Sequence, residues 1–447
     1  MHFSLPLLRV SMQDVTPLDF PTFPPGSYMP TARDVVITGL GVVSPIGVGR
    51  EAFWGSLTSG KSGIRAVTEL GGTDLPFAIG GEVVGFEPKE YVQPRKTLKV
   101  MCREIQAGYS AAMLAIADAK LAKGAIEPAR LGIVMGSEML YGEVPEMRDV
   151  FTHTAVDGKF QYDLWGTNAM RDLFPLWMLK YLPNMAACHI GIAIDARGPN
   201  NSIVQGAVSS LLAVIEAMSA IQRGAADVMI VGGSGSLINF SALTFRGWEQ
   251  ISKQQQLPAV SPRPFDLNRD GVLLGEGAGC LVLESREHAE KRGATLLAQV
   301  IGSASRCEAG RGPTIQGTAI DQSIAGALRS SQLDPASVGH VNAEAGGSVK
   351  FDALEAQAIQ KHLGDVPVFA PKSYFGDLGA GSGAVELIAS VLAIHQQQIP
   401  ATLNFETPDP ACPVNVTRTT TPLAKSAALV LNHSIFGQAA AVVLDAA

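Results

Sequence analysis

The residues of this chain that could do chemistry form neither a disulfide framework, a zinc site nor a phosphate loop. The five cysteines are odd in number and widely spaced, without a CxxC pair. The glycines of Gly232-Gly233 and Gly379–Gly383 come without a Walker lysine or a GxGxxG run. His433 follows an apolar stretch and offers an imidazole for proton transfer, although a histidine at a strand end more often serves the fold. We therefore expect no metal and no cofactor.

Three closely spaced motifs give the most specific signal. They are Arg263–Asp266 (RPFD), Arg269–Gly271 (RDG) and Gly275–Gly279 (GEGAG). This run resembles a hallmark of β-ketoacyl-ACP synthases, and the segments Val36–Gly47 and Arg197–Pro199 are similar to further parts of that family. The resemblance covers about residues 33–447 and is closest to the elongating synthase II type.

The resemblance implies a thiolase-like α/β fold of five layers, α-β-α-β-α, built from two related halves. It also implies a homodimer or heterodimer joined along the strand before the nucleophile. Such enzymes take an acyl group from acyl carrier protein or coenzyme A onto a cysteine at the N-terminus of a buried helix. Two histidines then assist decarboxylation of malonyl-ACP and stabilise the enolate and oxyanion, because preorganised donors stabilise developing charge.

The resemblance also shows that this chain has other residues at those three catalytic positions. The nucleophile position falls on Ala207, whose methyl group cannot be acylated. The first histidine, in the family's VNAHGT motif, falls on Glu344, and the second, in KSxxGH, falls on Asp377. The combined loss indicates inherited divergence. The alanine also distinguishes this chain from the decarboxylating members of the family, which have glutamine at the nucleophile position. Gln205 is not that glutamine, because it lies two residues before Ala207.

Polar residues around those positions are retained. The matches to supporting positions of the family are Lys372, Asp352, Glu355 and Glu386. The family's gating loop GFGG reads IFGQ here, with Phe436 as the gatekeeper. Ile435, Phe436 and Gln438 are thus the expected substrate-contacting residues, and the loss of two glycines predicts a stiffer loop.

Two interpretations of Glu344 and Asp377 stay open. Side chains that converge on one substrate carbon lie close together, and two close carboxylates do not both ionise cheaply. One would then hold a proton at neutral pH while Lys372 holds the other as an anion, which makes a working acid/base pair. Alternatively, Lys372 and a carboxylate form an ion pair that fills a retired pocket.

No replacement nucleophile is predicted. Ser202, Ser209 and Ser210 flank Ala207, but Ser209 and Ser210 are typical of a helix N-terminus and no aligned base would activate a serine. Cys188 is more typical of a small buried apolar residue than of a replacement thiol.

The apolar pattern predicts the alternating strands and helices that position these residues. The expected strands are Val35–Thr38, which ends in a turn at Gly39–Gly41, Leu131–Met135, Asp227–Val231, Val338–Ala343 and Ala427–Leu431. The expected helices are Ile105–Leu121, Ser209–Gln222 and Ala384–His395. We divide the chain into an N-terminal extension, 1–32, and two thiolase-like halves, 33–290 and 291–447. The aromatic segment 141–181 predicts an irregular excursion, either a lid or interface segment or a cap over the core.

Bulk composition fits this interpretation. The chain is 47% hydrophobic and 17% charged with a net charge of -7, which is typical of an α/β enzyme fold and argues against a nucleic-acid partner. Residues 1–32 resemble neither a secretory signal nor a membrane span, and the cysteine pattern predicts a reducing, cytoplasmic location.

We therefore expect a β-ketoacyl synthase-like protein of fatty-acid or polyketide synthesis that cannot perform cysteine-dependent condensation. It would act as an acyl-binding or non-condensing partner subunit. The alternative is an enzyme that uses Glu344 and Asp377 for decarboxylation, dehydration, isomerisation or cyclisation of an acyl thioester. The expected partners are acyl carrier protein or an acyl-CoA thioester, together with a second copy or an active synthase.

Overall fold

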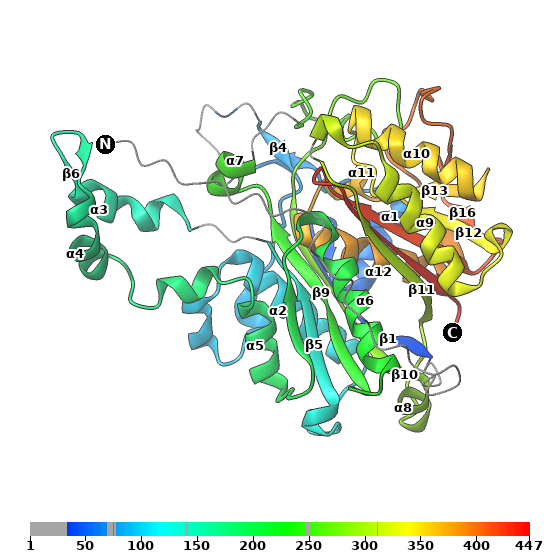
Figure 1. Ribbon diagram of the computed structural model, residues 1–447, viewed down its shortest axis with the longest axis horizontal. Coiled ribbons are helices and arrows are strands. Elements are labelled where there is room, and N and C mark those ends of the chain that lie inside the picture. The colour runs from blue at the N-terminus through cyan, green and yellow to red at the C-terminus, as the bar shows by residue number, and fades with distance from the viewer. Residues whose placement is uncertain (1–33, 69–74, 76, 139–141, 247–249, 311) are drawn as a thin grey trace, which may run out of the picture.

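The computed structural model describes residues 34–68, 75, 77–138, 142–246, 250–310 and 312–447 (Figure 1). The predicted extension 1–32 lies outside the described residues, and so does Tyr141 at the start of the predicted excursion.

The two halves of the chain repeat one strand order. The first half has the order β8-β5-β9-β10-β1 and the second has β13-β12-β17-β18-β11. In each half, two parallel pairs are followed by two antiparallel pairs. The strands are β1 (Val35–Ser44), β5 (Leu131–Gly136), β8 (Asn200–Ile203), β9 (Val228–Ser236), β10 (Glu276–Ser285), β11 (Ala298–Cys307), β12 (Val338–Asn342), β13 (Pro367–Phe369), β17 (Ala427–His433) and β18 (Gln438–Asp445). The repeated order confirms two related halves, while the boundary at residue 290 stays a prediction.

Hydrogen bonds between β1 and β11 join the two halves into one continuous sheet. The outer strand β15 (Asn415–Val416) extends the second half, and β2 (Gly47–Val48) pairs with β1. Short pairs away from the main sheet are β3 (Arg65–Ala66) with β4 (Ile79–Gly80), and β14 (Gln398–Ile399) with β16 (Thr421–Pro422). At the other end of the sheet, β8 pairs with β5 and has no second neighbour within the part of the chain that the structure describes.

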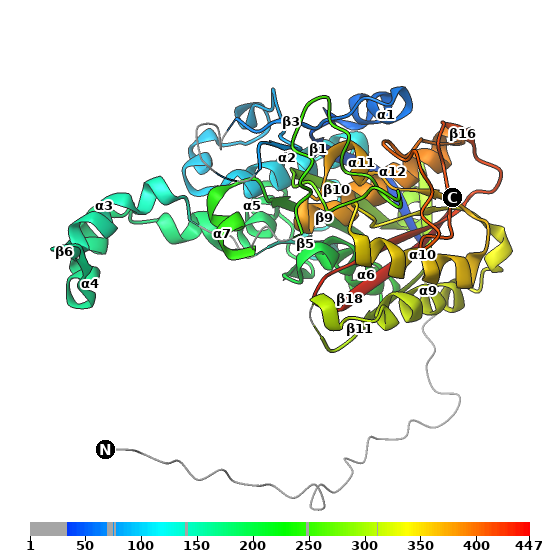
Figure 2. The same ribbon diagram turned by 90° about the horizontal axis from the view of Figure 1, so that it is seen from above.

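Helices complete the five predicted layers (Figures 1 and 2). The helices α2 (Arg103–Asp118) and α5 (Met185–Ile194) cover the outer face of the first half, and α9 (Thr318–Ser331), beside α10 (Val349–Leu363), covers the second. The helices α6 (Ser209–Gln222) and α12 (Ser382–Gln396) lie between the halves and contact strands of both. In α12 every residue from Ser382 to Ile394 is buried. A helix that is apolar on all sides is stable only inside a protein, which explains the middle layer.

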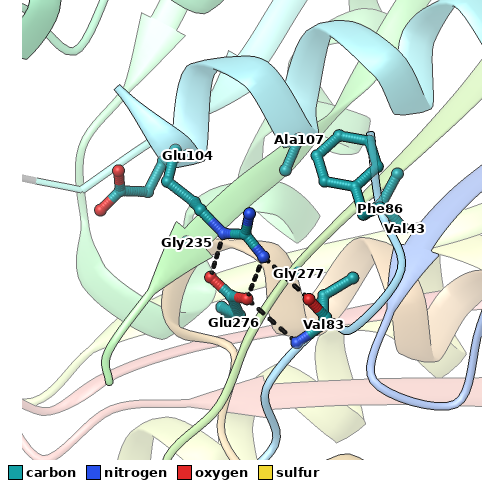
Figure 3. Close-up of a pocket in the computed structure, with 9 residues that line it drawn as sticks. Val43, Val83, Phe86, Glu104, Ala107, Gly235, Glu276 and Gly277 are labelled. Atoms are coloured by element: carbon teal, nitrogen blue, oxygen red, sulfur yellow. Dashed lines mark hydrogen bonds and ion pairs between the residues drawn. The ribbon is translucent and has the colours of Figure 1, made fainter. Parts of the chain in front are cut away.

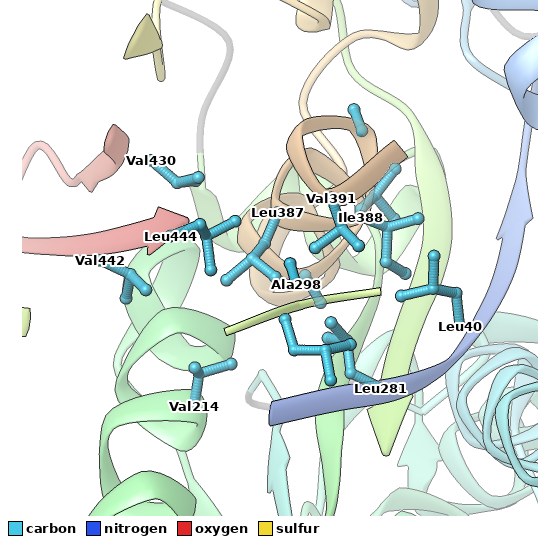
Figure 4. Close-up of a cluster of buried hydrophobic side chains, with 14 of the residues drawn as sticks. Leu40, Val214, Leu281, Ala298, Leu387, Ile388, Val391, Val430, Val442 and Leu444 are labelled. Atoms are coloured by element: carbon cyan, nitrogen blue, oxygen red, sulfur yellow. The ribbon is translucent and has the colours of Figure 1, made fainter. Parts of the chain in front are cut away.

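The main hydrophobic core forms where the two middle helices meet strands of both halves (Figure 4). Val214 of α6 and Leu387 of α12 pack there with Leu281 of β10 and Leu444 of β18, all of them fully buried. Each such side chain contributes about 1.5–3 kcal/mol to the free energy of unfolding. The same core therefore holds in place the two helices whose first turns border the predicted site.

Most predicted elements are confirmed within a few residues, and α6 matches its predicted bounds. The predicted turn at Gly39–Gly41 is wrong, because β1 continues to Ser44. These glycines serve close packing instead. A Cβ on Gly39 would lie 2.3 Å from the backbone oxygen of Ala115, and one on Gly41 would lie 1.9 Å from that of Ala111, both in α2.

The segment after β5 is more regular than predicted. It contains α3 (Val144–Thr154), the hairpin β6 (Ala155–Val156) and β7 (Lys159–Phe160), α4 (Tyr162–Asp172) and the 3-10 turn η4 (Trp177–Tyr181). Figures 1 and 2 show α3, β6 and α4 extending away from the body of the molecule. We call residues 144–172 the arm. The base of the segment does cover part of the core, because Tyr181 belongs to a buried apolar cluster and Trp177 packs against it, so its role as lid, interface segment or cap stays a prediction.

The remaining helices are α1 (Arg50–Ser59), α7 (Phe240–Arg246), α8 (Arg286–Lys291) and α11 (Lys372–Phe375). None of the helices in the described part of the chain is long and apolar enough to cross a membrane.

Replacement of Gly41 by alanine tests the close packing of β1 on α2. Because the new methyl group would overlap the backbone of α2, we expect Gly41→Ala to lower the free energy of unfolding by about 1–3 kcal/mol. The control is Gly55→Ala in α1, where a Cβ meets nothing within 4 Å and helix propensity should raise stability slightly. Chemical denaturation measures both variants, and equal midpoints would contradict the packing role.

Candidate functional site

Three elements bring the positions of Ala207, Glu344 and Asp377 together. Ala207 lies in the 3-10 turn η5 (Gly206–Val208), which runs directly into α6. Glu344 follows β12, and Asp377 follows α11. The turn η5 contacts both β17 and the 3-10 turn η8 (Gly379–Gly381), which begins two residues after Asp377. The predicted site residues therefore converge near the middle of the molecule.

Lys372 is the centre of the charged cluster. Its ammonium group donates a hydrogen bond to the carboxylate of Glu344, and its Nζ lies 3.8 Å from Asp377 Oδ1 and 3.8 Å from Glu386 Oε1. Its side chain is only 3% exposed. Burial alone would lower the pKa of Lys372, but the charges of Glu344, Asp377 and Glu386 outweigh burial and raise that pKa. Lys372 is thus a buried cation surrounded by carboxylates.

Asn432 links two of these carboxylates. Its Nδ2 atom donates to Glu344 Oε2 and, at 2.6 Å, to Glu386 Oε2. Burial raises the pKa of Glu344 well above its usual range, although Lys372 opposes the shift. Burial also raises the pKa of Glu386 to about 7. The carboxylate that shares a donor with Glu344 is therefore Glu386, whereas the sequence interpretation paired Glu344 with Asp377.

Asp377 is held by the start of α12. Its Oδ1 accepts hydrogen bonds from the backbone N–H of Gly379 at 2.9 Å and from the hydroxyl of Ser382 at 3.2 Å. Its side chain is 19% exposed, which makes it the most accessible of the carboxylates that contact Lys372. A helix N-terminus favours a negative charge, so Asp377 is well placed as an anion.

The GEGAG motif explains how Asp377 is positioned. The N–H of Gly275 donates to the backbone oxygen of Asp377, and the N–H of Asp377 donates to Leu273, both at 2.8 Å. A Cβ on Gly275 would lie 2.5 Å from the backbone oxygen of Phe375. Only a glycine at position 275 lets this strand approach the end of α11 so closely.

The glutamate of the same motif anchors α2. In the small pocket of Figure 3, Arg103 forms a two-pronged ion pair with Glu276, with nitrogen–oxygen distances of 2.9 and 2.7 Å. The N–H of Val83 donates to Glu276 at 3.0 Å. These contacts occupy the polar side of the pocket, so Glu276 serves the fold rather than chemistry.

Asp352 fixes the loop that carries Glu344. Its carboxylate accepts hydrogen bonds from the N–H groups of Phe265, Gly347 and Ser348, at 3.0–3.1 Å. Burial raises the pKa of Asp352 to about 6. Because Phe265 belongs to the RPFD motif, Asp352 joins that motif to the loop between Glu344 and α10.

Glu355 and His433 form a second pair beside Glu344. The backbone N–H of Glu344 donates to Glu355 Oε1 at 2.8 Å, and His433 Nε2 lies 3.4 Å from Glu355 Oε2. The His433 ring also stacks on Phe351. Burial disfavours the charged form of His433, but the hydrogen bond and charge of Glu355 outweigh it and raise the pKa of His433. These contacts favour a structural role for His433.

The gating loop is fixed by hydrogen bonds at several points. The backbone oxygens of Ile435 and Gly437 accept hydrogen bonds from Gly312 and Glu308, each at 2.8 Å. Gln438 Nε2 donates to Gln205 Oε1 at 3.3 Å, which connects the loop to the segment before Ala207. Phe436 is 46% exposed. These contacts suit a stiff loop, although its stiffness and its contact with substrate stay predictions.

Of the neighbouring hydroxyl and thiol groups, those of Ser209, Ser210 and Cys188 have hydrogen-bond partners, whereas the buried Oγ of Ser202 has none among the described residues. Ser209 Oγ donates to the backbone oxygen of Gly206 at 2.6 Å, and Ser210 Oγ accepts from the N–H of Ala384 at 3.0 Å. Ser202 lies on the edge strand β8. Cys188 lies on α5 in an outer layer and accepts a hydrogen bond from Asn184. That none of these four residues acts as a nucleophile stays a prediction.

Sequence reasoning missed Glu138 and Asn432. Glu138 follows β5, and its Oε1 accepts a hydrogen bond from the N–H of Ala380 in η8 at 2.9 Å. Glu138 could have been predicted as a site residue from its place after β5, which is parallel to β8 and β9. The carboxyl ends of parallel strands lie at the same edge of a sheet, where binding sites form. Asn432 gave no such signal, since an amide beside a histidine has no distinctive pattern.

The chain matches two family models. One describes the β-ketoacyl synthase N-terminal domain and covers residues 32–289, and the other describes the C-terminal domain and covers residues 297–406. A 3-oxoacyl-[acyl-carrier-protein] synthase 2 of Synechocystis is 33% identical, over 85% of this chain and 90% of the relative. A Streptomyces cyaneus relative, named as a polyketide β-ketoacyl synthase, is 33% identical over 92% of this chain and 98% of its own.

Solved structures agree with this match. The ishigamide ketosynthase/chain length factor superposes with a TM-score of 0.81 at 26% identity, over 93% of this chain and all of that chain. A type II polyketide acyl-carrier protein in complex with its ketosynthase gives a TM-score of 0.81 at 27% identity, with the same coverage. The five layers and the repeated strand order are thus those of thiolase-like ketosynthases, and the chain belongs to the β-ketoacyl synthase family.

Proposed function

We propose that this chain is a non-condensing, acyl-binding subunit of a β-ketoacyl synthase assembly in fatty-acid or polyketide synthesis. The observation that carries the proposal is the composition of the converged site. A methyl group stands at the nucleophile position, and carboxylates that contact one buried lysine stand at the other two. A methyl group has no lone pair with which to attack a thioester, so a covalent acyl-enzyme cannot form at Ala207.

The charge inventory supports carboxylates held in place by fixed donors over a working acid/base pair. Four carboxylates, those of Glu344, Glu355, Asp377 and Glu386, surround the two cationic groups of Lys372 and His433. Glu344 receives hydrogen bonds from Lys372 and Asn432, and Asp377 receives two of its own. A carboxylate that is already satisfied by fixed donors is a poor candidate for proton transfer to a substrate, because those hydrogen bonds would have to break first.

The solved relatives support a heterodimer. One of them combines a ketosynthase with a chain length factor, and another holds an acyl-carrier protein. Among the described residues β8 pairs only with β5, so its outer edge can accept a strand from a second subunit. We therefore propose an active synthase as the partner and acyl carrier protein as the source of the acyl group. We also place the assembly in the cytoplasm, since all five cysteines are free.

The purified chain should form no β-ketoacyl product from acyl-ACP and malonyl-ACP. The matched variant Ala207→Cys places a thiol at the middle residue of η5, two residues before α6 begins. The N-terminus of a helix stabilises a nearby thiolate. We expect Ala207→Cys to gain the mass of one acyl group without forming product, because Glu344 and Asp377 do not replace two imidazoles. Intact-mass spectrometry and product chromatography provide the readout. A β-ketoacyl product formed by the wild-type chain would refute the proposed function.

The alternative function is acid/base chemistry on a bound acyl thioester. The raised pKa of Glu344 and the partial exposure of Asp377 are the observations that favour it. It predicts turnover of at least one 3-oxo, 3-hydroxy or enoyl thioester, with a loss of at least 100-fold in Glu344→Gln or Asp377→Asn. Glu290→Gln, at the surface of α8, is the control that should keep full turnover. If a broad panel of thioesters stays unchanged, this alternative is rejected.

The buried cluster should make stability depend on pH. Glu386 has a folded-state pKa of about 7 against an ordinary value of 4.5, so the folded state binds more protons between those pH values. The free energy of unfolding should therefore fall as pH rises from about 5 to 8, and the raised pKa of His433 acts in the same direction. We expect Glu386→Gln to reduce this decline by about 1–3 kcal/mol. Denaturant titrations at several pH values between 5 and 8 measure the free energy of unfolding. The control Glu290→Gln should show the same fall with pH as the wild type. If Glu386→Gln also shows that full fall, Glu386 is not the group that binds the proton.

A further inference from the structure

A groove on the outer face of the first half shares no residue with the charged cluster. It has a volume of about 600 Å³ and is lined by the second half of α2, by residues of the stretch 90–94 and by Ala193 of α5. The helices α2 and α5 lie side by side in the outer layer (Figure 1). Clefts that bind ligands have volumes of about 300–1,000 Å³, so this groove is large enough to hold several residues of a peptide.

The walls of the groove are mostly aromatic and aliphatic. The apolar lining includes Tyr91, Pro94, Tyr109, Met113 and Leu114. The ring of Tyr91 stacks on Phe86 with the ring centroids 5.9 Å apart, and the hydroxyl of Tyr109 donates to the backbone oxygen of Gln93 at 3.3 Å. These contacts hold the walls in place before anything binds, which reduces the entropy lost on binding.

The charge at the groove narrows the class of occupant. One acid, Glu90, and one base, Lys123, line it, and both are exposed. Opposite charges of equal number favour an uncharged occupant over a strongly acidic or basic one. Proline-rich peptides have this character, and they bind to aromatic-lined grooves because their polyproline II helix is already formed before binding.

The chain itself carries such a peptide. Residues 20–32 read FPTFPPGSYMPTA, with four prolines and no charged side chain. Pro21 and Pro24 have the PxxP spacing at which aromatic-lined grooves recognise a polyproline II helix. Phe20 and Phe23 add apolar side chains within the same six residues. This segment lies outside the described residues, and it directly precedes the part of the chain that contacts α2.

The segment is within reach of the groove. The backbone N–H of Leu40 in β1 donates to Asp118 at the end of α2, at 2.9 Å, and the adjoining Ala117 lines the groove. Asp34 is six residues before Leu40, and six extended residues span about 20 Å. The ten residues from Pro24 to Asp34 span about 31 Å in a polyproline II conformation. The connection is therefore long enough to bring Pro24 to the groove.

We propose that residues 20–25 bind in this groove of the same chain, so that the groove is an intramolecular binding site for the proline-rich part of the N-terminal extension. A short flexible connection keeps a tethered segment at an effective concentration of about 1 mM, so weak contacts are enough to fill the groove. The proposal is independent of the chemistry at Ala207, because no residue of the charged cluster lines the groove.

Photocrosslinking of the full chain tests the proposal. We place p-benzoyl-phenylalanine at position 23 in place of Phe23, and in a second protein at position 3 in place of Phe3, at the far end of the extension. On irradiation the benzophenone carbonyl inserts into nearby C–H bonds, with a preference for methionine. Gel electrophoresis separates single chains from crosslinked pairs, and peptide mass spectrometry maps the crosslinked residue.

We expect the probe at position 23 to crosslink within one chain to Met113 or to another residue of the groove. The variant Ala117→Trp fills the groove from an exposed position and should lower the yield at least fivefold. The matched control Ala336→Trp, exposed in the second half, should keep the wild-type yield. Thermal unfolding verifies that both variants are folded.

Two results would overturn the proposal. One is a yield at the groove that is equal from positions 3 and 23, or equally high in Ala117→Trp, because the contact would then be unspecific. The other is a groove crosslink found only between two chains, which would assign the groove to the extension of a second copy. Absence of any crosslink at the groove from position 23 would also reject it, whatever the outcome of the assays at Ala207.

Discussion

The buried ammonium group of Lys372 is the interaction on which the site depends. It contacts Glu344 directly and lies within 3.8 Å of two further carboxylates, with almost no exposure to water. A lone buried carboxylate is costly, so each of these acidic residues is tolerable only because Lys372, Asn432 or the start of α12 compensates it. Loss of Lys372 would leave several uncompensated charges, whereas loss of one acid leaves the others still paired. The cluster therefore behaves as one unit.

The scaffold around this unit explains what the family's motifs do in this chain. Glycine at position 275 lets one strand approach α11, Glu276 holds α2 through Arg103, and Asp352 ties the RPFD segment to the loop that carries Glu344. None of these contacts involves a reacting atom. Selection for the fold alone retains such motifs, so their presence identifies the architecture and says little about the chemistry.

Much of the fold could be predicted from the sequence, because apolar periodicity and the glycine motifs are local signals. The helix Ser209–Gln222 and the strand after it are examples, and the convergence of Ala207, Glu344 and Asp377 followed from resemblance. The sharing of Asn432 by Glu344 and Glu386 could not be predicted, since it joins residues 46 and 88 positions apart in the chain. The glycines of β1 resemble a turn in sequence, and only the position of α2 shows that they serve packing. The helices of the arm were missed because large apolar side chains such as Tyr162 and Met170 are exposed there, so the apolar positions do not all mark one buried face.

The repeated halves give the two middle helices equivalent places, with η5 leading into α6 and η8 leading into α12. Each half therefore directs one set of helix N-terminal N–H groups toward the site. At η8 those groups are already occupied by the carboxylates of Asp377 and Glu138. The N–H groups of Gly379 and Ala380 are thus satisfied within the chain itself and are not left over to bind an anionic group of a ligand.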